Sequence, residues 1–441
     1  MKDKFINGLL MVASKLQMNR YMSSIKHAFT ANMPIIIAGA FGTLVANVVT
    51  STTTTGLSLA KLPGMAFLGE LTPIFNSINY ATINFFAIGI VVLIAIELGK
   101  YYGHEETMLP VVVLASYIAV VQPFTTFKYV DAAGADVIAT INNVLPRNFT
   151  DARGLFLAMI IGIVATELYV KLVDSHKLDI KMPEQVPTNI AKSFSVLFPS
   201  ILTILIVAVF GFVFFKLTGL YLYDAIFKFI QEPMKGLLTG LPGYLVLVWM
   251  TTLLWSVGIH GTQVLQPIYQ ATLLQALTEN MDAVNAGASG SQIPNILNTS
   301  FMQVFSTGSG AGMTAGLIVA ILLFSKRDDY KTIAKLSIPI GLFNINETMT
   351  FGLPIVLNPL LIIPFMAAPA ASATFGYFMT KIGVAIPMAY TVPWTTPPLL
   401  KSWLSTGGHM GTVLVELGAY VIAFLIYIPF VLIANKQQVS E

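Results

Sequence analysis

A single carboxylate stands in the apolar segment GLFNINETMTFGLP, which covers residues 341–354. An ionisable side chain inside an apolar segment usually faces a transport pathway or a partner. In a sheltered polar cavity Glu347 could accept a proton from a bound hydroxyl group, so we expect it to be buried and to act as a general base. The alternative is that Glu347 lies at a hairpin tip, where it faces water or caps a helix.

Two asparagines, Asn344 and Asn346, precede this acid. Their amides offer both donors and acceptors, which suits a ligand with many hydroxyl groups. They could equally be turn residues, because asparagine tolerates left-handed backbone.

One of the five histidines, His260, lies between Gly258 and Gly261 at the end of an apolar stretch. Its ring can donate a hydrogen bond to a substrate oxygen or carry a proton. The alternative is a structural role at the end of a helix.

Trp394 lies among prolines in VAIPMAYTVPWTTPPLLKSW, residues 384–403. A flat aromatic face can stack on the C–H face of a sugar ring, and the prolines restrict the backbone that presents it. The alternative is an aromatic anchor at a membrane interface, which is the role we expect for Trp255 and Trp403.

The composition indicates the environment in which these residues work. Of the 441 residues, 55% are hydrophobic and only 10% are charged, whereas soluble domains carry about 25% charged residues. Several apolar stretches approach the roughly 20 residues that a helix needs to cross a bilayer. They are continuous, whereas the strands of a membrane β-barrel would alternate. We therefore expect an all-α polytopic membrane protein.

The chain contains no cysteine, which excludes disulfides, thiolate metal sites and cysteine nucleophiles on this polypeptide. The histidines lack the spacing of metal ligands. Neither a phosphate-binding loop nor a dinucleotide fingerprint is present. We expect no metal and no cofactor.

Nine membrane spans are expected from the apolar stretches. Residues 263–279 predict a further helix, and two polar, glycine-rich breaks, one around residues 285–312 and one at 341–354, predict broken or re-entrant elements. At the N-terminus Phe5, Leu9, Val12 and Leu16 recur at helical spacing, which indicates an interfacial amphipathic helix. The expected spans are 29–49, 81–99, 106–124, 153–173, 194–217, 241–259, 311–325, 355–379 and 411–434.

Basic residues orient these spans, because cytoplasmic loops are enriched in lysine and arginine. They cluster at the N-terminus and in the loops at 171–192 and 326–335, and single lysines, Lys100 and Lys436, mark a further loop and the C-terminus. Both termini are therefore expected in the cytoplasm, with the chain crossing the cell membrane. The predicted regions are an amphipathic helix (1–28), an N-terminal transmembrane region (29–217), an amphipathic connector (218–240), a transmembrane region with re-entrant elements (241–434) and a tail (435–441).

Charges elsewhere receive simpler interpretations. Glu97 and Glu167 lie inside apolar spans but near their expected cytoplasmic ends. His104, which precedes two glutamates, resembles a solvated turn. Arg153 is expected at the outer mouth.

Three motifs together, GIHG, NINETMTFGLPIVLNP and YTVPWTTPP, resemble the membrane (IIC) component of the phosphoenolpyruvate-dependent sugar phosphotransferase system. The resemblance is to the lactose, cellobiose and diacetylchitobiose branch and extends over essentially the whole chain. It implies ten transmembrane helices, two re-entrant hairpins and a homodimer in the cell membrane of a bacterium. Residues 29–217 would then form the scaffold or dimerisation region and residues 241–434 the sugar-binding transport region. It also implies an elevator-like movement that carries a β-linked disaccharide inward.

The resemblance further implies how the motifs act. Glu347 and His260 would face the 6-hydroxyl of the sugar, with Asn344 and Asn346 nearby and Trp394 stacked on a sugar ring. The phosphocysteine of a IIB protein would phosphorylate the hydroxyl, and IIB would receive its phosphoryl group from a IIA protein. Because this chain has no cysteine, that IIB must be a separate polypeptide.

The residues by themselves leave other functions open. An ion-coupled sugar transporter could use Glu347 and His260 as a proton relay, and broken helices near mid-membrane suit that class as well. A membrane hydrolase or transferase is less well supported, because no second well-placed acid accompanies Glu347.

Overall fold

The structure is a computed structural model that describes residues 11, 14–15, 18–53, 58–130, 134–180, 183, 187, 194–353, 355–356 and 358–437. The four apolar positions of the expected amphipathic helix lie outside the described residues, as does most of the tail at 435–441. The described chain is mostly helical, as its composition predicts.

The chain divides into two compact units. The carboxy-terminal unit contains residues 37–79 and 234–441, and the central unit contains residues 17–36 and 80–233. The division into a scaffold and a transport region made from the sequence is a functional one and stays a prediction.

Helices of the central unit pack along aliphatic faces. Phe86, Ile90, Ile94 and Leu98 repeat every four residues of α5 and are all buried, which places them on one face of the helix. A Cβ atom on Gly162 of α8 would lie 3.1 Å from Ile94 Cγ2, so this glycine lets the two helices approach closely. The helices are α2 (Arg20–Ala31), α5 (Phe86–Tyr102), α6 (Met108–Ala119), α7 (Arg147–Thr150), α8 (Leu155–Asp174), α10 (Leu197–Thr218) and α11 (Leu222–Ile226).

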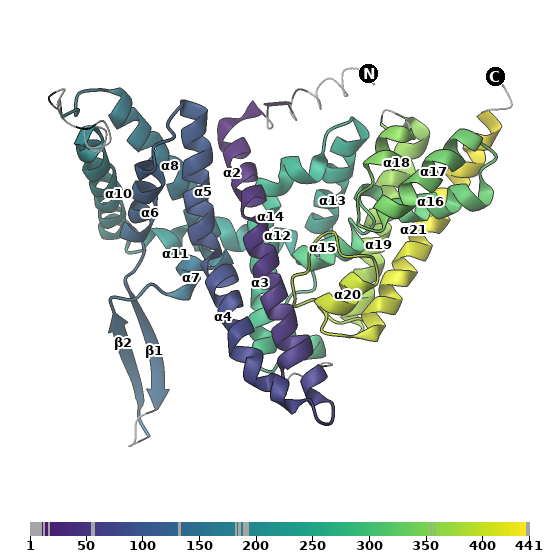
Figure 1. Ribbon diagram of the computed structural model, residues 1–441, viewed down its shortest axis with the longest axis horizontal. Coiled ribbons are helices and arrows are strands. Elements are labelled where there is room, and N and C mark those ends of the chain that lie inside the picture. The colour runs from purple at the N-terminus through teal and green to yellow at the C-terminus, as the bar shows by residue number, and fades with distance from the viewer. Residues whose placement is uncertain are drawn as a thin grey trace. The chain divides into compact units, whose positions relative to one another are not determined.

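An antiparallel hairpin, β1 (Phe124–Val130) and β2 (Asp136–Asn142), extends from the central unit beyond its helices (Figure 1). The expectation of an all-α protein is wrong for these residues. Their β-branched and aromatic side chains favour strands, and they lie between two of the expected spans, where no apolar run constrains the backbone to a helix.

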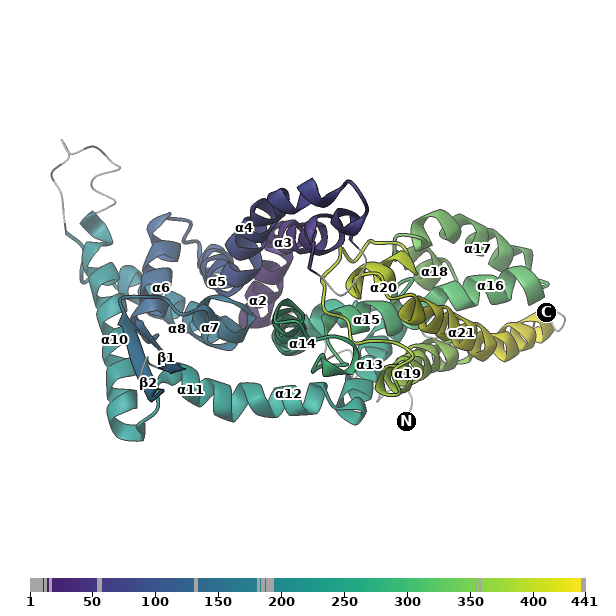
Figure 2. The same cartoon turned by 90° about the horizontal axis from the view of Figure 1, so that it is seen from below.

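Helices of the carboxy-terminal unit enclose two apolar clusters. One cluster contains side chains of α13, α14, α15, α19 and α21, and the other contains the end of α13 with side chains of α16, α17, α18, α19 and α21. Helices α16, α17, α19 and α21 lie side by side (Figure 2). The helices are α3 (Met33–Val45), α4 (Thr72–Thr82), α12 (Glu232–Leu238), α13 (Leu241–Ser256), α14 (Gly261–Asn285), α15 (Thr299–Phe305), α16 (Thr314–Phe324), α17 (Asp328–Gly341), α18 (Glu347–Gly352), α19 (Pro359–Lys381), α20 (Leu400–Ser405) and α21 (Met410–Gln437); α3, α4 and α12 extend across the boundary between the units.

A helix occurs at each of the nine expected spans, and α14 occupies the position predicted for a further helix. Among the described residues, six helices are long and apolar enough to cross a membrane, and a bent pair, Leu222–Leu238 with Leu241–Ser256, makes up to seven. Met108–Ala119 and Ala311–Phe324 are shorter apolar helices. The multi-pass character is thus supported, whereas the count of ten crossings rests on the resemblance.

Candidate functional site

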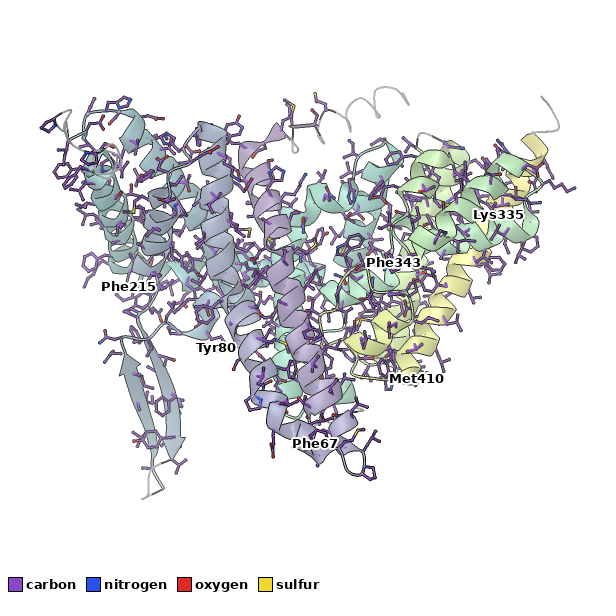
Figure 3. All side chains as sticks on the ribbon, in the orientation of Figure 1. Phe67, Tyr80, Phe215, Lys335, Phe343 and Met410 are labelled. Atoms are coloured by element: carbon purple, nitrogen blue, oxygen red, sulfur yellow. The ribbon has the colours of Figure 1, made fainter. Side chains whose placement is uncertain are left out.

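The turn that carries Glu347 joins α17 to α18 and inverts the usual pattern of burial. Leu342, Phe343 and Ile345 are exposed, whereas Asn344 and Asn346 are buried (Phe343 is labelled in Figure 3). Buried amides need hydrogen-bond partners, because an unpaired polar group away from water is costly. The two asparagines therefore hold the turn against the rest of the unit.

Asn344 connects this turn to two other irregular segments. Its Oδ1 accepts a hydrogen bond from the backbone N–H of Ser309 at 2.7 Å. Its Nδ2 donates to the carbonyl oxygens of Trp394 at 2.9 Å and Thr396 at 2.8 Å. Asn344 itself has a φ of 63°, so the turn interpretation of this asparagine is confirmed. Two of the sequence motifs, NINE and VPWTT, are thus in direct contact.

Asn346 connects the turn to the glycine-rich segment before α16. Its Nδ2 donates to the carbonyl of Ala311 at 2.6 Å and contacts Thr314 Oγ1 at 3.2 Å. Gly310 has a φ of 87°, and a Cβ atom there would lie 2.3 Å from Asn346 Cγ. Only glycine fits this position, both for its backbone and for the space that Asn346 occupies.

Glu347 begins α18 and its side chain is exposed. The prediction that the Glu347 carboxylate is sheltered is therefore wrong for the single subunit. The reason is geometric, since the turn that directs Asn344 and Asn346 inward directs the next side chain outward. The role of Glu347 as a base stays a prediction.

His260 caps the N-terminus of α14. Its Nδ1 accepts from the backbone N–H of Gln263 at 3.3 Å and contacts Thr262 Oγ1 at 3.0 Å. The structural interpretation of this histidine is confirmed for Nδ1. An acceptor nitrogen carries no proton, so the neutral ring is protonated on Nε2, which is the atom that could donate to a substrate.

The two flanking glycines are required for this geometry. Gly258 has a φ of 83°, and a Cβ atom on Gly261 would lie 1.9 Å from the carbonyl oxygen of Thr251. The glycines of GIHG therefore serve the turn and the close packing of α13 on α14.

Trp255 brings His260 and α18 to one place. Its ring centroid lies 4.3 Å from that of His260 and 6.3 Å from that of Phe351, which is one helical turn after Glu347. Trp255 is 3% exposed, so the interpretation of this residue as an interfacial anchor is wrong. Its indole contributes to the packing between the two motifs.

Trp394 lies in the strap, which we define as residues 384–399 between α19 and α20. Residues 386–393 have neither helix nor strand, yet most of them are buried. Non-helical backbone at membrane depth must be buried in protein or line a polar cavity. Buried side chains donate hydrogen bonds to the backbone carbonyl oxygens of the strap. Asn280 and Asn298 donate to Met388, Ser300 donates to Tyr390, and Asn344 and Lys401 donate to Trp394. The Trp394 side chain remains 40% exposed, which leaves its ring available for contact.

Two charged residues near the strap were not predicted to be functional. Lys401 is 2% exposed and Glu416 is 1% exposed. Glu416 carries the same signal as Glu347, because it is a lone acid in the apolar run GTVLVELGAY. Lys401 has no comparable signal, since it lies in a polar, proline-containing connection.

Charges of the central unit form ion pairs at helix ends. Glu97 binds Lys100 at 2.8 Å, and Glu167 lies 3.7 Å from Arg20 and accepts from the Tyr102 hydroxyl. At the other end of α8, Arg153 binds Asp151, a buried residue. No group of three or more histidine, aspartate or glutamate side chains among the described residues could hold a metal ion.

His104 differs from the solvated turn that the sequence suggests. Its side chain is only 14% exposed, and its ring nitrogens lie 2.8 Å from Glu106 and 3.0 Å from Asp174. The ring thereby links the loop between α5 and α6 to the end of α8.

Comparison with known proteins agrees with the three motifs. A family profile described as phosphotransferase system, EIIC matches residues 26–369. An oligo-beta-mannoside-specific EIIC component of Bacillus subtilis (strain 168) is 31% identical, over 100% of this chain and 96% of its own. A cellobiose-specific EIIC component of Lactococcus lactis subsp. lactis (strain IL1403) is 29% identical, over 98% and 97%.

A solved structure is also similar along its whole length. It is the crystal structure of the transporter ChbC, the IIC component from the N,N'-diacetylchitobiose-specific phosphotransferase system. The TM-score is 0.87 with 30% identity, covering 98% of this chain and 97% of that one. The profile and these full-length similarities show that this chain belongs to the EIIC family of the phosphotransferase system.

Proposed function

We propose that this chain is a sugar permease that binds a β-linked disaccharide and carries it into the cytoplasm, where the 6-hydroxyl is phosphorylated. The observation that carries the proposal is the contact between motifs far apart in the sequence. Asn344 bonds to the backbone of the strap that presents Trp394, and Trp255 packs between His260 and α18. Relatives named for cellobiose, oligo-beta-mannosides and diacetylchitobiose support a β-linked substrate.

Each motif has a distinct part in this proposal. Trp394 stacks on a sugar ring, and His260 donates from Nε2 to a sugar oxygen. Glu347 accepts the proton of the 6-hydroxyl. Asn344 and Asn346 were predicted to contact the sugar; their hydrogen bonds to backbone carbonyls support a positioning role in addition.

The chemical step needs a base and an incoming phosphoryl group. The sugar oxygen attacks phosphorus in line, a new O–P bond forms, and the S–P bond to the donor cysteine breaks as its thiolate leaves. Glu347 takes the hydroxyl proton, which makes the oxygen a better nucleophile. An exposed carboxylate is accessible to both the sugar and a docking protein.

The donor in this proposal is a separate IIB protein that docks on the cytoplasmic side and is itself phosphorylated by IIA. The chain works as a homodimer with both termini in the cytoplasm. Residues 241–434 act as the moving transport region, while 29–217 form the scaffold.

A binding panel with detergent-purified protein tests the substrate class. Calorimetry should show binding of at least one β-linked disaccharide, such as cellobiose, diacetylchitobiose or lactose, and none of the α-linked maltose. Equal affinity for maltose would contradict the proposed class.

Reconstituted vesicles test the coupling. Sugar phosphate should appear only when phosphorylated IIB is present. Accumulation of free sugar driven by a pH gradient, without IIB, would instead indicate a proton-coupled transporter.

A further inference from the structure

Two buried charges of opposite sign lie at the ends of one turn in the strap, the tryptophan turn, which we define as residues 394–399. Lys401 is 2% exposed and Glu416 is 1% exposed. A buried charge is costly unless it is paired or hydrogen-bonded, because it has left water. Neither residue belongs to the motifs that define the proposed site.

Lys401 holds the first residue of the tryptophan turn. Its Nζ donates to the carbonyl oxygen of Trp394 at 2.7 Å. The same oxygen accepts from Asn344 Nδ2 at 2.9 Å. The backbone of Trp394 is therefore fixed from two directions, by a charged donor and by the turn that carries Glu347.

Glu416 holds the last residue of the same turn. The backbone N–H of Leu399 donates to Glu416 Oε2 at 3.0 Å. Leu399 has a φ of 65° and a ψ of −44°, a conformation that a leucine rarely adopts. Such strain persists only where the surroundings hold it in place. A carboxylate acceptor provides a strong bond for that purpose.

Lys401 and Glu416 form no direct ion pair; each holds the turn by a hydrogen bond to its backbone. They act on one segment from both ends, while the Trp394 side chain at its start stays partly exposed. A ligand contact on a backbone that is already fixed avoids the entropy of ordering it at each binding event.

We propose that Lys401 and Glu416 are positioning residues that set the affinity for the saccharide by locking the tryptophan turn. The saccharide part of this inference rests on the proposed function. The locking of the turn is independent of it and can be measured without any sugar.

Ser300 offers a matched control. It is 1% exposed and donates from Oγ to the carbonyl of Tyr390 at 3.0 Å. Ser300→Ala thus removes one buried hydrogen bond to the strap, as Lys401→Met does, but outside the tryptophan turn. A role of Lys401 in general stability alone would make the two variants behave alike.

The first experiment measures the turn in the absence of sugar. In the reference chain, Trp249 and Trp403 are both replaced by phenylalanine. The emission of this chain minus the emission of the same chain with Trp394→Phe added is the fluorescence of Trp394. Lys401→Met should at least double the acrylamide quenching constant of Trp394, whereas Ser300→Ala should leave it unchanged. Unchanged quenching in Lys401→Met would overturn the inference.

The second experiment measures the dissociation constant for whichever β-linked disaccharide the unmodified chain binds. Lys401→Met should raise it about tenfold, Lys401→Arg less than threefold, and Ser300→Ala less than twofold. Equal weakening in Lys401→Met and Ser300→Ala would overturn the affinity claim. If the unmodified chain binds no such disaccharide, the proposed function fails, while the quenching result still decides whether Lys401 positions the turn.

If Lys401→Met does not fold, both measurements are made on Glu416→Gln instead. The glutamine can still accept from Leu399, but a neutral acceptor makes a weaker bond than a carboxylate. The substitution should raise both the quenching constant and the dissociation constant about twofold to threefold. Wild-type values of both would overturn the inference.

Discussion

Helices α5 and α8 of the central unit meet along aliphatic side chains, whereas the irregular segments of the carboxy-terminal unit meet through amides, hydroxyls and two buried charges. In α5 and α8 the backbone satisfies itself, so charged side chains are left for the helix ends. In the strap and the α17–α18 turn the backbone has no regular partner, so side chains must supply one. The second arrangement requires particular residues at particular positions, and the proposed site lies there.

The largest expected effect tests whether this polar region also carries the chemistry. Glu347→Gln keeps the shape of the side chain but removes the base. Phosphorylation by phospho-IIB should fall by about 10²–10⁴-fold, the usual contribution of a general base, while the disaccharide dissociation constant changes by less than about tenfold. Transfer measured in vesicles at saturating sugar is the readout; an unimpaired rate would show that another group takes the proton.

A second prediction concerns how closely the irregular segments fit. Gly310→Ala combines a left-handed backbone with a clash at 2.3 Å against Asn346. We expect a loss of about 3 kcal/mol or more in the free energy of unfolding, measured by thermal unfolding in detergent. Its control is Gly64→Ala, where φ is 82° but nothing lies within 4 Å of the added atom; the loss there should be about 1 kcal/mol. Equal losses would mean that the contact with Asn346 is unimportant.

The smallest expected effect tests the central unit. Burial by itself would lower the pKa of His104, but its hydrogen bonds to Glu106 and Asp174 raise it, and the net shift is upward. Because the pKa is higher in the folded protein, protonation of the ring stabilises the fold. This contribution is complete below the pKa of the unfolded chain, about 6.5, and is lost as the pH rises through the pKa of the folded protein. Between about pH 6 and pH 9 the melting temperature should therefore fall by about 1–3 °C more in the wild type than in His104→Gln. Identical pH profiles would show that the ring does not link the loop to α8.

Much of the architecture followed from apolar periodicity. The nine expected spans and the helix after His260 all have helical counterparts, because a run of about 20 apolar residues has few alternatives in a membrane. The β1–β2 hairpin lay between such runs and was missed. For the site, the left-handed turn at Asn344 was open to prediction from residue type, whereas the exposure of Glu347 depended on which way the turn faces.

Composition and local pattern, which need no knowledge of distant contacts, determined that this is a multi-pass helical chain with a few polar motifs. Only the tertiary structure decided what those motifs touch. Asn344 meets Trp394 across 50 residues, and Trp255 meets Phe351 across nearly a hundred. A hydrogen bond of a side chain to a distant carbonyl leaves no mark in the sequence near that carbonyl. For the same reason Lys401 became recognisable as a buried cation only once the strap was folded around it.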